Sequence, residues 1–98
     1  MFIRLSLSKP RAESRAEAIY IEDHLLRHFT ELTGFVTGYR LENSEYIGRV
    51  TVWEDQDAAD RAALDEHMMA SRSRLIALQL PTEKDTLELS FSGSPPGS

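Results

Sequence analysis

The sequence FIRLSLS at residues 2–8 is matched by a similar pattern, TLELSFS, at residues 86–92. Apolar and polar residues alternate in both stretches, which is typical of a β-strand with one buried face. Each stretch therefore predicts a strand, one near either end of the chain. The residues expected to face the core are Ile3, Leu5, Leu7, Leu87, Leu89 and Phe91. The residues expected on the opposite face are Phe2, Arg4, Ser6, Glu88 and Ser90.

A helix and a β-hairpin are predicted after the first strand. Apolar residues recur at helical spacing over residues 12–33, and Gly34 follows where a left-handed C-cap favours glycine. Residues 35–41 and 46–53 are rich in strand-forming residues. The four polar residues between them, ENSE at 42–45, suit a hairpin turn.

A second helical region is predicted between the hairpin and the last strand. Asp55 is placed to cap its N-terminus, and helical character continues to about Leu80, with Pro81 ending it. Asp65 offers a second cap if the region bends into two helices.

The predicted order is strand, helix, strand, strand, helix, strand. Right-handed crossovers then give an antiparallel sheet in the order 4-1-3-2 with the helices on one face. We therefore predict a ferredoxin-like α+β domain over residues 1–92, followed by a disordered tail at 93–98 that lacks apolar side chains. The mixed polar and apolar face opposite the helices suits packing against a second copy, so we expect a homodimer through the sheet.

Composition excludes several classes of protein. The chain has 98 residues, a net charge of −5 and no cysteine, so it forms one small domain without disulfides. An acidic balance argues against a nucleic-acid partner. No apolar run approaches the roughly 20 residues of a membrane helix, and the N-terminus lacks the pattern of a signal peptide. We expect a cytoplasmic protein with no membrane partner.

Two stretches carry a resemblance to a known family. They are LTGFVTGY at residues 32–39 and GRVTVWED at residues 48–55. With these, residues 1 to about 92 resemble the antibiotic biosynthesis monooxygenase family of dimeric α/β barrels. The resemblance implies that two sheets pair into a barrel. It also implies a range of activities, since members include cofactor-independent oxygenases of polyketide aromatics, haem-degrading oxygenases, quinol oxygenases and proteins of unknown activity.

The residues of the haem-degrading members are not retained. Their asparagine, tryptophan and haem-ligating histidine fall on Ile3, Ala62 and Ser71. Without a nitrogen ligand near position 71, ordinary haem ligation is not available there. We therefore expect no haem and no other cofactor.

The polyketide oxygenases match slightly better. Their tryptophan at the end of the third strand and an arginine in the second helical region match Trp53 and Arg72. Their histidine, asparagine and tyrosine fall on Leu41, Arg49 and Ala59 and are missing here. The resemblance thus implies an oxygenase-like site in which part of the usual set of side chains is absent.

Three residues are candidates for catalysis. The indole of Trp53 can stack on a flat substrate, and the Arg72 guanidinium can stabilise a developing oxyanion. A neutral His67 imidazole near the pocket mouth can accept a phenolic proton. The alternatives are that Trp53 packs at an interface and that His67 is a partly buried or helix-start residue.

Three further residues are candidates for substrate binding. Arg49 shares a strand face with Trp53, Met69 could line a pliable apolar cavity, and Tyr39 lies on the hairpin. Each has a structural alternative, in which Arg49 pairs with an acid such as Glu88, Met69 belongs to the core, and Tyr39 pairs with Tyr46 across the hairpin.

Metal binding is not expected. His24 and His28 are one helical turn apart, a spacing that can hold a metal, but the sequence identifies no third ligand. An exposed helix face explains the pair more simply.

Two functions remain open from the sequence. One is a cofactor-independent monooxygenase-like enzyme that deprotonates a small phenolic, quinol or other aromatic compound and lets it react with oxygen. The other is a non-catalytic dimeric module that binds a small apolar ligand or another protein. The partner expected besides a second copy is a small apolar or aromatic molecule.

Overall fold

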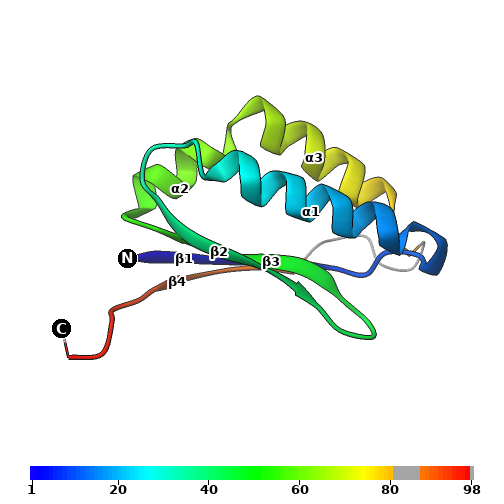
Figure 1. Ribbon diagram of the computed structural model, residues 1–98, viewed down its shortest axis with the longest axis horizontal. Coiled ribbons are helices and arrows are strands. Elements are labelled where there is room, and N and C mark those ends of the chain that lie inside the picture. The colour runs from blue at the N-terminus through cyan, green and yellow to red at the C-terminus, as the bar shows by residue number, and fades with distance from the viewer. Residues whose placement is uncertain (81–86, 98) are drawn as a thin grey trace.

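One sheet and a layer of helices make up the fold (Figure 1), and the computed structural model describes residues 1–80 and 87–97. The strands are β1 (Phe2–Ser8), β2 (Phe35–Glu42), β3 (Ile47–Trp53) and β4 (Leu87–Ser92). The helices are the short 3-10 turn η1 (Ala12–Ser14), α1 (Arg15–Phe29), α2 (Gln56–Ala63) and α3 (Glu66–Ala77). All three α-helices cover the same face of the sheet.

The four strands form one antiparallel sheet in the order β2-β3-β1-β4. Read from the other edge, this is the predicted order 4-1-3-2. In the two central strands Arg4 lies opposite Thr51 and Leu5 lies opposite Val50, so side chains of like polarity share a face. The predicted ferredoxin-like α+β fold is confirmed.

Side-chain caps mark where α2 and α3 begin, whereas α1 ends earlier than predicted. Its last residue is Phe29 and its C-cap is Thr30, so Gly34 does not cap it but lies in the turn that leads to β2, with a left-handed φ of 87°. Asp55 accepts a hydrogen bond from the backbone N–H of Ala58 at 2.8 Å, and Asp65 accepts one from that of Met68 at 3.1 Å. The second helical region is therefore two capped helices, which was the bent alternative, while Pro81 lies outside the described residues.

The two faces of the sheet are the reverse of those predicted. Arg4 on β1 donates to the carbonyl oxygen of Ala59 on α2, and Arg49 on β3 donates to Glu22 on α1. The polar positions of these strands therefore point towards the helices. Alternation alone identifies two faces, but it cannot tell which one the helices cover when helices supply partners for polar side chains.

The apolar positions lie on the face without helices. Leu87, Leu89 and Phe91 on β4 are between 42% and 50% exposed, and Ile3, Leu5, Leu7, Val50 and Val52 are partly buried beside them. We call this surface, made by the eight residues just named, the open apolar face. A continuous apolar surface of this kind is a typical mark of a protein interface.

The buried core lies between the sheet and the helices. Its largest side chains include Leu25 and Phe29 of α1, Trp53 of β3, and Met68 and Leu75 of α3. Small residues of α2 fill the rest of this layer: Ala58, Ala59 and Ala62. Within residues 1–80 and 87–97, no helix has the length and hydropathy needed to cross a membrane.

Gly34 offers a test of the connection between α1 and β2. We expect Gly34→Ala to lower the free energy of unfolding by at least about 1–2 kcal/mol, because the left-handed backbone disfavours a Cβ and that Cβ would overlap the Cβ of Ala58. Urea unfolding at one protein concentration measures the change. Gly93→Ala is the matched control, since a Cβ there meets only the mobile end of Ile3, and an equal loss in both variants would contradict the prediction.

Candidate functional site

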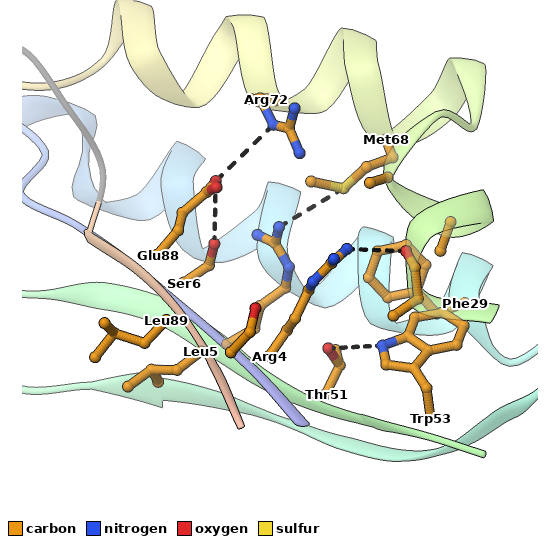
Figure 2. A pocket seen from close by; sticks show the side chains of 15 residues that line it. Arg4, Leu5, Ser6, Phe29, Thr51, Trp53, Met68, Arg72, Glu88 and Leu89 are labelled. Atoms are coloured by element: carbon orange, nitrogen blue, oxygen red, sulfur yellow. Dashed lines mark hydrogen bonds and ion pairs between the residues drawn. The ribbon is translucent and has the colours of Figure 1, made fainter. Parts of the chain in front are cut away.

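A cavity of about 330 Å³ lies between the sheet and the helices (Figure 2). It is lined by Arg4, Leu5, Ser6, Phe29, Arg49, Thr51, Trp53, Ala59, Ala62, Ala63, Met68, Arg72, Glu88, Leu89 and Ser90. The volume is at the small end of the range for small-molecule sites. Polar side chains of β1, β3 and β4 form its floor because these strands turn their polar faces towards the helices.

Aromatic rings form one end of the cavity. Trp53 is 2% exposed and meets Phe29 and Phe35 edge to face, with ring centroids 5.4 Å and 5.1 Å away. Its Nε1–H donates to the hydroxyl of Thr51 at 3.0 Å, which satisfies the only polar atom of the indole. The ring is thereby held in one orientation.

A buried ion pair lies further along β3. The Arg49 Nη1 donates to both carboxylate oxygens of Glu22 at 3.0 Å, and both residues are less than 10% exposed. Burial raises the pKa of Glu22, and the charge and hydrogen bond of Arg49 oppose that shift. The second terminal nitrogen of Arg49 donates to the Met68 sulfur at 3.6 Å, and a thioether is a weak acceptor.

Arg4 lies on β1 between the aromatic end and the ion pair. It donates to the carbonyl oxygen of Ala59 at 3.0 Å and to the Asp60 carboxylate at 2.6 Å. Both partners belong to α2, so this guanidinium fixes α2 over the sheet as it lines the cavity. Figure 2 shows its side chain directed across the floor towards the helices.

Arg72 enters the cavity from α3, on the opposite side. Its Nε lies 4.0 Å from a carboxylate oxygen of Glu88 on β4, and that oxygen also accepts from the hydroxyl of Ser6 at 3.5 Å. The Arg72 Nε is buried, and no described residue accepts a hydrogen bond from it. Arg72 and Glu88 thus form a loose polar cluster at the end of the cavity away from Trp53 (Figure 2).

The structure brings together half of the site residues predicted from the sequence. Trp53, Arg49 and Arg72 all line the cavity. His67 and Met69 are exposed on α3, and Tyr39 is 63% exposed on β2, on the side of the sheet away from the helices. Those three residues do not line it.

The structural partners expected for Arg49 and Tyr39 also differ from those observed. The acid that pairs with Arg49 is Glu22, whereas Glu88 lies beside Arg72. Tyr39 is opposite Val50 in the hairpin and therefore does not face Tyr46. The hairpin register is set by the turn, which the sequence placed only approximately.

All three histidines of the chain lie together where α1 meets α3, with His24 and His67 exposed and His28 partly buried. The ring of His67 lies 4.5 Å from that of His28 and 5.3 Å from that of His24. His28 Nε2 is 2.8 Å from the Asp65 carboxylate. Partial burial raises the pKa of Asp65, but the hydrogen bonds from the Met68 N–H and from His28 outweigh it and leave that pKa below its usual value.

Across residues 1–80 and 87–97, no group of three metal-ligating side chains has a geometry that could hold an ion. The cavity itself is lined by no histidine or cysteine, so its residues do not fit haem ligation.

Sequence reasoning missed Arg4 and Glu88 as cavity residues because it assigned their strand faces to the wrong side. One signal was present: Glu22 lies at helical spacing between Ala18 and Leu25, within the apolar stripe of α1. A carboxylate on a stripe that must be buried predicts a basic partner on the facing strand.

Comparison with known proteins identifies the fold. No family model matches the sequence, and no curated protein does. Solved structures do match over nearly their whole lengths. Rv0793 from Mycobacterium tuberculosis superposes with a TM-score of 0.85 at 13% identity, covering 99% of this chain and 98% of that one.

Two further structures carry names that indicate an activity. A candidate antibiotic biosynthesis monooxygenase from Deinococcus radiodurans superposes with a TM-score of 0.86 at 13% identity, covering 100% of this chain and 97% of that one. SnoaB, a cofactor-independent oxygenase from Streptomyces nogalater, gives 0.79 at 18% identity over 98% of this chain and 95% of its own. The chain has the fold of the antibiotic biosynthesis monooxygenases. At these identities the likeness concerns the fold.

The buried ion pair can be tested by a double-mutant cycle. We expect Glu22→Met and Arg49→Met each to lower the free energy of unfolding by about 3–5 kcal/mol, because each leaves the other charge buried without its partner. The double variant should lose much less than the sum, since it buries neither charge. Urea unfolding of all four proteins gives the coupling free energy, and additive losses would contradict the prediction.

Proposed function

We propose that the protein is a cofactor-independent monooxygenase-like enzyme that acts on a small phenolic, quinol or anthrone-type compound bound in the cavity. The observation that carries this proposal is the convergence of Trp53, Arg49 and Arg72 on one cavity. The shared fold with SnoaB supports it.

The cavity offers side chains for each part of such a reaction. A flat ring can lie against Trp53 and Phe29, which leaves its oxygen substituent near the guanidinium groups. A guanidinium stabilises a phenolate or enolate as its negative charge develops. Lowering the energy of that anion is the main task, because an electron-rich carbanion can reduce oxygen without a redox cofactor.

Proton removal is assigned to Glu88. Among the described residues that line the cavity, the Glu88 carboxylate is the side chain of a type that can serve as a general base, whereas His67 lies on the outer surface. For an anthrone, the substrate carbon loses two hydrogens and gains a bond to one oxygen atom. The O–O bond breaks and the second oxygen leaves as water, so the products are a quinone and water.

Oxygen consumption tests the proposal. We expect uptake with a panel of anthrones and hydroquinones, reduced about 10²–10³-fold in Arg72→Gln because an oxyanion donor is lost. Glu88→Gln should lower the rate as well. The rate in His67→Ala should stay near that of the wild type.

Arg74→Gln is the matched control, because Arg74 is on the same helix but pairs with Glu17 at the surface. Equal losses in Arg72→Gln and Arg74→Gln would assign the effect to the helix instead of the cavity. If no compound in the panel raises uptake, the enzyme is rejected in favour of the non-catalytic ligand-binding module.

We also propose that the working unit is a homodimer formed through the open apolar face. The exposed leucines and Phe91 of β4 would otherwise remain in water. A chain of this size buries a modest core alone, so covering this face with a second copy stabilises both copies.

A charge on this face should prevent pairing. We expect the wild type to have about twice the 11.1 kDa mass of the chain in solution, and Val50→Asp to be monomeric or much less stable. Light scattering after size exclusion measures the mass. Tyr20→Asp, a similar change at an exposed ring on α1, should leave the dimer intact, and a wild-type monomer at micromolar concentration would contradict the proposal.

A further inference from the structure

We infer that the cavity selects a ligand carrying a carboxylate, held by Arg72 and Arg49 while its ring lies against Trp53. This inference deepens the proposed function, on which it rests for the location of the site. It names a property of the ligand, negative charge at the end opposite the ring, that neither the fold nor the proposed reaction requires.

The cavity is polarised along β3. Trp53 and Arg49 are four residues apart on one face of the strand, so their Cα atoms are separated by about 13 Å at roughly 3.3 Å per residue. Trp53 and Phe29 form the aromatic end, whereas Arg49, Arg72 and Glu88 lie at the other. A ligand that meets both ends therefore carries a polar group on an aromatic ring.

Strong donors without matching acceptors lie at the polar end. Among residues 1–80 and 87–97, the buried Nε of Arg72 finds no hydrogen-bond acceptor, and the second terminal nitrogen of Arg49 donates to the weakly accepting Met68 sulfur. Buried donors normally find acceptors, so donors left in this state favour a ligand that supplies them. A carboxylate has two oxygens and accepts from guanidinium groups in a shared plane.

Charge at this end also favours an anion. Of the described residues that line the cavity, three carry a guanidinium group and one, Glu88, carries a carboxylate. Glu22 on α1 and Asp60 on α2 already pair with Arg49 and Arg4, and neither carboxylate lines the cavity. The Arg72 Nε, 4.0 Å from Glu88, is the most weakly engaged of the three.

A matched pair of probes tests the inference without turnover. We expect 4-hydroxybenzoate to bind at least about tenfold more tightly than the neutral 4-hydroxybenzamide, since hydrogen bonds to a charged group contribute more than neutral ones. Titration calorimetry in a chloride buffer measures both. Trp53 is the only tryptophan of the chain, so a change in its fluorescence on binding places the probe in the cavity.

Variants locate the charge that is responsible. Arg72→Gln should remove the preference for the carboxylate, Arg72→Lys should retain part of it, and Arg74→Gln should leave it unchanged. Equal affinity for the two probes, no binding of either, or the same loss in Arg74→Gln would overturn the inference. Because binding is measured apart from oxygen uptake, a protein that oxidises neutral phenols but shows no such preference would refute this inference alone.

Discussion

The ion pair between Glu22 and Arg49 is the interaction on which the arrangement of the molecule depends. It joins the middle of α1 to β3, and both charges are buried. A buried charge is stable only beside its partner, so α1 must lie over the face of the sheet that carries Arg49. That requirement turns the polar positions of the neighbouring strands inwards with it, because side chains opposite one another in a sheet share a face.

The small residues on α2 are also explained by the arginines that face the helices. A floor of arginines needs acceptors close by, and Arg4 finds one in the backbone carbonyl of Ala59. Alanines at 58, 59 and 62 let the helix approach the sheet without filling the space over Thr51 and Trp53. The layer between sheet and helices therefore contains room for a ligand, whereas larger residues on α2 would have closed it.

The sequence predicted the order of elements well because each boundary has a local cause. The left-handed Gly34 and the side-chain caps Asp55 and Asp65 act within a few residues. The orientation of the sheet has no local cause, since alternation in FIRLSLS fits either face. Assigning the helices to the wrong face of the sheet placed Arg4 outside the site. His67 was misplaced for a different reason, because one position along a helix rotates a side chain by about 100°.

The inverted polarity links the two surfaces of the sheet. Every arginine turned towards the helices leaves an apolar neighbour in the strand turned away from them, so a polar cavity on one side produces an apolar face on the other. Because Glu88 and Ser90 of β4 point into the cavity, Leu89 between them points to the opposite face, where a monomer leaves it exposed. The open apolar face is thus a physical consequence of lining a cavity with polar strand residues. A second copy that covers that face would stabilise the strands that hold the arginines, even though it touches none of their guanidinium groups.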